Sequence, residues 1–151
     1  MIRPRLNEAL TEAIKAKEKR AVSTLRLILA CLKDRDIAAR GKGVTDGISD
    51  DEILALLQTM IRQREDSIAL YEQGGRLDLA EGEREEVAVI KRFLPEQMDE
   101  NSIEQAVESV IADVGAKGLK DMGRTMAELR TRYAGRMDFT KASGLVKSAL
   151  A

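Results

Sequence analysis

Apolar side chains recur at spacings of three and four along nearly the whole chain, and Gly or Pro interrupts this pattern at intervals. The spacing matches the 3.6 residues of an α-helical turn rather than the alternation of a half-buried strand. The residue types agree, because only 3% of the residues are aromatic and Trp is absent, whereas Ala, Leu, Met, Glu, Lys and Arg are abundant. We therefore predict an all-α fold.

Start and stop signals divide the pattern into helices. Ser49-Asp50-Asp51-Glu52 has the form of a capping box, in which the Ser and Glu side chains each accept a hydrogen bond from the other's backbone amide. Gly74-Gly75 and Pro95 mark helix ends, and we expect both glycines to adopt the left-handed conformation. The predicted helices span about residues 4–18, 20–39, 50–73, 77–94, 101–114, 121–133 and 138 to the end.

The helices become shorter after Pro95, which predicts two domains. Residues 1–95 form an N-terminal helical domain that contains a long antiparallel hairpin folded at Gly75. Residues 96–151 form a small C-terminal domain of three helices. Each helix of the second domain has its own stop signal, so we expect this domain to fold alone, although about 55 residues give a marginal core.

Charged residues interrupt the apolar stripes of the hairpin. In the first of its two helices, Ile53, Leu57, Met60 and Tyr71 define a stripe, and Arg64 lies in the middle of it. In the second helix, Leu79, Ile90 and Phe93 define the stripe, and Glu83 and Glu86 lie inside that one. Arg64 precedes Gly75 by 11 residues and Glu86 follows it by 11, so the fold at Gly75 brings them level. We predict an ion pair and interpret it as structural, because buried charges need partners.

Residue types that carry catalysis are scarce. The chain has no His, so the commonest general base and the commonest metal ligand are missing. It has one cysteine, Cys31, which is too few for a thiolate metal cluster. Gly41-Lys42-Gly43 and Gly74-Gly75-Arg76 lack the strand that accompanies a phosphate-binding loop, so we interpret both as helix ends. We identify no catalytic residues, assign no metal and no cofactor, and do not expect the chain to be an enzyme by itself.

Charge is segregated along the chain although the net charge is only −1. Residues 1–45 carry 11 Lys and Arg against 5 acids, and residues 117–151 carry 8 against 3, so both segments are suited to a polyanion. Five cations of the second segment lie outside its predicted core, where their donors are expected to be free for phosphates. We predict that they bind nucleic acid: Lys120, Arg124, Arg130, Arg132 and Arg136.

No run of residues is long and apolar enough for a membrane span, and the Met-Ile-Arg-Pro start lacks the apolar stretch of a signal peptide. The single cysteine also excludes a disulfide framework and is typical of a reducing compartment. We therefore expect a cytoplasmic protein that makes no contact with membranes.

Several separated motifs occur in a characteristic order. Their residues are Gln63, Arg64, Gly75, Arg76, Asp78, Glu86, Pro95, Asp121, Met122, Gly123, Gly135 and Asp138. In this order the motifs closely resemble the GatB/YqeY family, and in particular its stand-alone YqeY-like members. The resemblance covers essentially the whole chain. One departure is Met137, which stands where the resemblance leads us to expect a small residue.

The resemblance implies a function that the residues alone do not indicate. The C-terminal part of the family is similar to the tail of the B subunit of the tRNA-dependent amidotransferase, a carbon–nitrogen ligase with glutamine as amido-N-donor, where the tail helps to hold tRNA. The catalytic body of that enzyme has no counterpart in this chain. We hypothesise a non-catalytic module that binds tRNA, or a protein of the tRNA-amidotransferase or aminoacyl-tRNA machinery. Two alternatives stay open: an accessory amidotransferase component that acts by protein contacts, and a structural or regulatory partner without an RNA role.

Overall fold

The computed structural model describes residues 1–151 and contains seven α-helices, one short 3-10 helix and no strand. This confirms the predicted all-α fold. The chain divides into two compact units, Met1–Leu94 and Pro95–Ala151. No helix combines the length and the apolar character that are needed to cross a membrane. Each unit has a hydrophobic core of its own.

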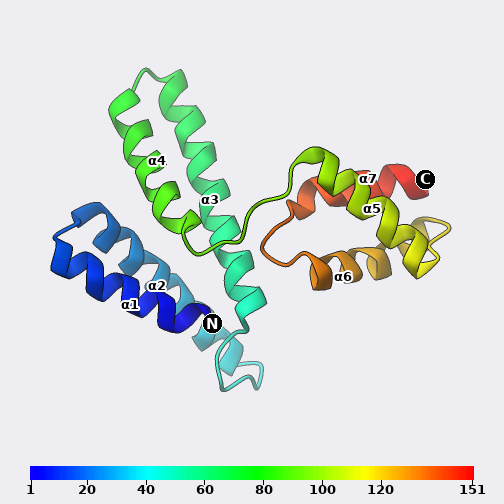
Figure 1. Cartoon of the computed structure of the whole chain (residues 1–151), viewed down its shortest axis with the longest axis horizontal. Helices are drawn as coiled ribbons and strands as arrows, with labels where there is room; N and C mark the ends of the chain where they lie inside the picture. Colours follow the sequence, from blue (N-terminus) through cyan, green and yellow to red (C-terminus); the bar gives the residue numbers. More distant parts are fainter. The chain divides into compact units, whose positions relative to one another are not determined.

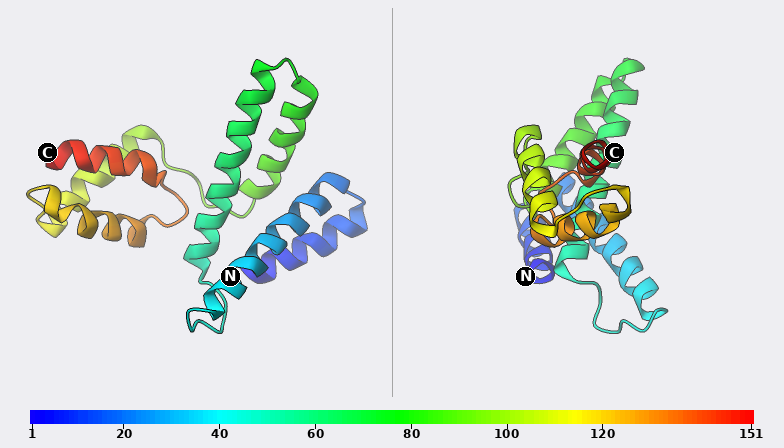
Figure 2. Two further views of the ribbon diagram at one scale, coloured as in Figure 1. Left: turned by 180° about the vertical axis from the view of Figure 1, so that it is seen from behind. Right: turned by 90° about the vertical axis from the view of Figure 1, so that its right-hand side faces the viewer.

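The first unit consists of two helix pairs (Figure 1). Helices α1 (Ile2–Ala16) and α2 (Lys19–Arg40) lie side by side, joined through Lys17 in the left-handed conformation. Helices α3 (Asp50–Gln73) and α4 (Leu77–Lys91) form the long antiparallel hairpin, as the view from behind also shows (Figure 2). The loop of residues 41–49 connects the two pairs.

The predicted signals at the ends of α3 are present, with one correction. The Ser49 hydroxyl accepts a hydrogen bond from the Glu52 amide at 3.2 Å, and the Glu52 carboxylate accepts one from the Ser49 amide at 3.5 Å. At the other end only Gly75 is left-handed, with φ of 73°, whereas Gly74 has φ of −83°. The prediction for Gly74 was wrong because one left-handed residue is enough to let the Arg76 amide donate back to the Tyr71 carbonyl.

The core of the first unit lies where α1, α2, α3 and α4 meet. Its fully buried members include Leu6, Leu25, Ile28, Ile53, Leu57 and Ile90. Leu79 was predicted in this core but is 38% exposed, and Ala80 is buried instead. The turn between α3 and α4 lies away from the α1–α2 pair (Figure 1).

The second unit contains α5 (Glu100–Val114), a 3-10 turn η1 (Leu119–Asp121), α6 (Met122–Arg132) and α7 (Phe139–Leu150). Asp99 and Asp138 cap α5 and α7 by accepting hydrogen bonds from backbone amides. The buried residues include Ile103, Val107, Val110, Met126, Leu129, Met137, Val146 and Leu150. Met137 is fully buried, so its large side chain fills the core at the position where a small residue was expected.

Candidate nucleic-acid interface

Two of the five predicted nucleic-acid-binding cations are engaged within the second unit. Arg132 lies 2.7 Å from Asp113 and 2.8 Å from Glu128, and these carboxylates raise the pKa of the guanidinium group. Arg124 donates to the Val114 carbonyl at 2.7 Å and to Asp121 at 3.1 Å. The expectation that both guanidinium groups are free was therefore wrong.

The sequence placed Arg124 and Arg132 outside the core of α6 but could not show what α5 presents opposite them. Opposite Arg124, α5 presents the Val114 carbonyl at its C-terminal end, which accepts the hydrogen bond from Arg124. The last carbonyls of a helix have no partner inside the helix and are open to such a donor. The Lys117 amide and Arg124 together hold the pKa of the Asp121 carboxyl below its ordinary value. These contacts join α6 to α5 and to the turn before α6.

The other three predicted cations have no carboxylate partner. Lys120 is exposed and forms no ion pair or side-chain hydrogen bond. Arg130 lies over the Phe139 ring, with 5.9 Å between its guanidinium carbon and the ring centroid, and none of its donors is used. Arg136 makes one long hydrogen bond of 3.5 Å to the Glu96 carbonyl. Arg130 and Arg136 lie near the C-terminal end of α6, where most of their N–H groups are available to an anion.

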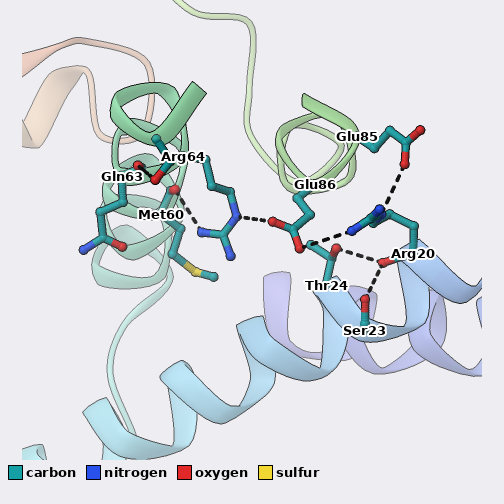
Figure 3. A network of polar contacts seen from close by, with 9 residues as sticks. Arg20, Ser23, Thr24, Met60, Gln63, Arg64, Glu85 and Glu86 are labelled. Carbon is teal, nitrogen blue, oxygen red and sulfur yellow. Dashed lines mark hydrogen bonds and ion pairs between the residues drawn. The ribbon is translucent and has the colours of Figure 1, made fainter. Parts of the chain in front are cut away.

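The predicted ion pair of the hairpin is confirmed, and it belongs to a larger network (Figure 3). Arg64 is buried, and it donates to the Glu86 carboxylate at 3.2 Å and to the Met60 carbonyl at 3.1 Å. Arg20 of α2 lies 3.1 Å from Glu85 and 3.9 Å from Glu86. Glu86 therefore joins cations from α2 and α3, and the network ties three helices together.

Glu83 lies one turn before Glu86 and belongs to the same network. Burial and the neighbouring Glu86 raise the pKa of its carboxyl, while Arg64 and Arg20 oppose the rise. The hydroxyls of Ser23 and Thr24 in this network both donate to the Arg20 carbonyl (Figure 3). We interpret it as structural, since every charged group in it is used to satisfy another.

A second polar contact was missed by the sequence analysis. Arg3 of α1 donates two hydrogen bonds of 2.7 Å to Asp36 of α2, and a third of 3.0 Å to the Ile48 carbonyl. Asp36 also accepts from the Ile48 amide at 2.9 Å. The Arg3 guanidinium lowers the pKa of the Asp36 carboxyl to about 2. Because 33 residues separate Arg3 from Asp36, no local pattern points to this contact.

Little else in the molecule resembles a reaction centre. Acidic and Cys side chains do not gather anywhere in groups of three or more that could hold a metal ion. An open groove of about 450 Å³ lies between α5 and α7. Its lining residues are Glu100, Ile103, Glu104, Lys141, Gly144, Leu145 and Ser148, and Lys141 is paired with Glu100 at 3.3 Å.

Comparison with known families decides the relationship of this chain. The model of the Yqey-like protein family matches residues 3–150. The chain belongs to the YqeY-like family. Similarity to the amidotransferase tail rests on the sequence motifs alone.

Three relatives of this YqeY-like chain are proteins of fungi. An uncharacterized protein of Schizosaccharomyces pombe is 29% identical over 91 residues, which are 60% of this chain and 70% of that protein. Altered inheritance of mitochondria protein 41 of Lachancea thermotolerans is 34% identical over 89 residues, which are 59% of this chain and 46% of that protein. The protein of the same name from Pyrenophora tritici-repentis is 26% identical over 138 residues, 90% of this chain and 73% of its own length. The latter two names place those proteins in mitochondria, so the cytoplasmic location stays a prediction for this chain.

Most of the motif residues that led to the YqeY-like family are structural. Gly75 and Gly135 adopt the left-handed conformation that their turns require. Asp121 and Asp138 accept hydrogen bonds from backbone amides, and Arg76 pairs with Asp78 at 3.3 Å beside the hairpin turn. The remaining motif residues are Gln63, Pro95, Met122 and Gly123, of which all but Met122 are exposed.

Proposed function

We propose that this protein is a non-catalytic module that binds tRNA, or a protein that carries tRNA, through its second unit. The observation that supports the proposal is the presence of three exposed cations there, Lys120, Arg130 and Arg136, that no carboxylate of the chain engages. The motif resemblance to the amidotransferase tail also supports binding of tRNA or of a protein that carries tRNA. The family label of a carbon–nitrogen ligase describes the larger relative, whose catalytic body this chain does not contain.

The chemistry of these cations favours contact with the phosphate backbone. Arginine presents planar donors that match a phosphate, and such contacts carry no base sequence. Tyr133 and Phe139 are half-buried against the core of the unit, so they are not available as stacking platforms for single-stranded bases. The proposal is therefore recognition of folded RNA by its shape. Three phosphate contacts correspond to a slope of about −2 to −3 in a plot of log affinity against log salt concentration.

The test is binding of labelled tRNA by fluorescence anisotropy over a range of salt concentrations. Replacing Arg130 and Arg136 with Ala is expected to weaken binding and to make the slope less negative by about two. Arg132→Ala is the matched control from the same helix, because its guanidinium is already occupied by Asp113 and Glu128. The control should change tRNA affinity little. A wild-type protein that shows no salt-sensitive tRNA binding at low ionic strength refutes the proposal.

The exposed tip of the α3–α4 hairpin favours a second candidate, an accessory component that acts by protein contacts. Leu70 is 68% exposed and Leu77 is 65% exposed, on either side of the turn. Large exposed apolar side chains are typical of protein contacts when they form one patch. Replacing both with Ser should abolish co-purification with an amidotransferase subunit if this candidate is correct, and should leave tRNA binding unchanged.

A further inference from the structure

Helix α2 carries four cations at intervals of seven residues. They are Lys19, Arg26, Lys33 and Arg40. Seven residues are almost two helical turns, so at 100° per residue the four side chains lie within about 60° of arc. The stripe from Lys19 to Arg40 extends for about 31 Å at 1.5 Å per residue. We call these four residues the α2 ridge.

All four ridge residues are exposed, and none forms an ion pair or a side-chain hydrogen bond. The absence of ion pairs distinguishes the ridge from Arg3 and Arg20, two cations of the same helix pair that contact carboxylates. Arg3 is held by Asp36, and Arg20 by Glu85 and Glu86. The structure therefore uses some cations for packing and leaves the ridge without a hydrogen bond or an ion pair.

One acid of α2 acts on the ridge, because Arg40 helps to lower the pKa of the Asp36 carboxyl. Helix α2 contains only two acids, Asp34 and Asp36. Asp36 is one turn from Lys33 and from Arg40, but both of its oxygens already accept hydrogen bonds from Arg3. Asp34 is exposed, lies about 60° or more around the helix from the ridge, and forms no ion pair. Along α2 the four ridge cations therefore outnumber the one acid, Asp36, that lies at a neighbouring turn.

Three residues that lie between the ridge cations on the same face of the helix are small or apolar. They are Ser23, Ala30 and Ile37, each four residues after a ridge cation. Short side chains at the first two positions let a large rigid surface approach the helix closely. Exposed cations at regular spacing along a straight element suit a partner whose negative charges also repeat along a rigid axis.

We propose that the α2 ridge binds the phosphate backbone of duplex RNA and forms a second RNA contact, separate from the cations of the second unit. This inference rests on the proposed RNA-binding function and adds the surface and the structural class of RNA that it contacts. An anionic lipid surface fits less well, because a helix that lies in a membrane inserts an apolar face. The apolar face of α2, with Leu25, Ile28 and Leu32, is buried in the core.

The test uses the full-length protein and a plain RNA duplex of about two helical turns, without any tRNA-specific feature. The ridge variant replaces Lys19, Arg26, Lys33 and Arg40 with Gln, which keeps helix propensity and removes four charges. The control variant replaces four exposed lysines outside the ridge with Gln: Lys15, Lys42, Lys91 and Lys117. Both variants have the same net charge, and thermal melts verify that both are folded.

The ridge variant is expected to lose duplex affinity by on the order of tenfold or more at low salt, and its salt slope should become less negative by about three to four. The control variant should lose much less. Equal losses in the two variants would show that only net charge matters and would overturn the proposal, as would unchanged binding by the ridge variant.

Two further measurements separate this proposal from the previous one. The Arg130 and Arg136 double variant should keep its affinity for the plain duplex even though it loses affinity for tRNA. If that variant binds tRNA normally while the ridge variant loses duplex binding, the role of the second unit fails and the ridge proposal stands. Vesicles that contain anionic lipid are the last arm: ridge-dependent binding to vesicles without ridge-dependent binding to duplex RNA contradicts the proposal.

Discussion

Replacing Asp36 with Asn removes one negative charge from the contact that joins α1, α2 and the loop of residues 41–49, and it nearly preserves side-chain shape. The pKa of Asp36 is lowered from 3.8 to about 2, first of all by the hydrogen bonds from Arg3. A pKa difference of one unit corresponds to about 1.4 kcal/mol, so the ionised carboxylate contributes at most about 2.5 kcal/mol to the free energy of unfolding. Arg3 is 34% exposed and water screens the pair, which reduces the expected loss to about 1–2 kcal/mol.

The same pKa difference fixes the pH range in which this contribution acts. Because the carboxyl has a lower pKa in the folded protein than in the unfolded chain, the folded state favours the ionised form. The stabilisation is complete above the unfolded pKa of about 4 and disappears as the pH falls through about 2. The difference in stability between the wild type and Asp36→Asn should therefore be full near neutral pH and shrink steadily below about pH 4.

Urea unfolding followed by far-ultraviolet circular dichroism measures the loss, and hydrogen exchange by mass spectrometry assigns it to a unit. Amides of α2 should exchange faster in Asp36→Asn, while amides of α6 and α7, which belong to the other unit, should not change. Wild-type stability of the variant near neutral pH, or a difference that persists undiminished at pH 2, refutes the reasoning.

Three further predictions concern the other structural contacts. Glu86→Gln leaves the buried Arg64 without its closest carboxylate and should cost about 2–4 kcal/mol in urea unfolding, more than Arg64→Met, because Arg20 remains beside Glu86 in the latter. The double variant should cost less than the sum of the two, and strict additivity would contradict the pairing. The isolated Pro95–Ala151 segment should melt cooperatively, and a featureless melt would count against its independence. Gly47→Ala should destabilise by about 1–2 kcal/mol, since Gly47 has φ of 87° and an added Cβ would lie 2.5 Å from Arg3, whereas Gly118→Ala has open space and should be close to neutral.

The elements that the sequence predicted well are those specified by neighbouring residues. The capping box at Ser49 and the left-handed turn at Gly75 depend on the few residues around each of them. The pair of Arg64 and Glu86 is distant in sequence, but it follows from helix periodicity once the hairpin is assumed. These predictions needed no knowledge of how one helix pair packs on another.

The features that were missed depend on that packing. Arg20 reaches Glu85 and Glu86 only because α2 crosses α4, and 65 residues separate Arg20 from Glu85. Likewise, periodicity places Arg132 outside the core of α6 but does not reveal Asp113 on the adjacent helix. Leu79 shows the converse error, because its angular position predicted burial but the adjacent Ala80 is buried in its place. Helical periodicity predicts which way a side chain points, and the packing of other helices decides what it contacts.

The equal distances of Arg64 and Glu86 from Gly75 limit how the hairpin can change in length. One residue inserted on either side of the turn displaces that half of the hairpin by about 1.5 Å and rotates it by about 100° relative to the other half, so the guanidinium and the carboxylate no longer meet. A seven-residue insertion in one helix keeps the angle to within about 20° but shifts the level by about 10 Å. Only matched insertions in α3 and α4, each close to a whole number of turns, keep the pair together. Homologues with a longer hairpin should therefore have gained residues on both sides of the turn at once.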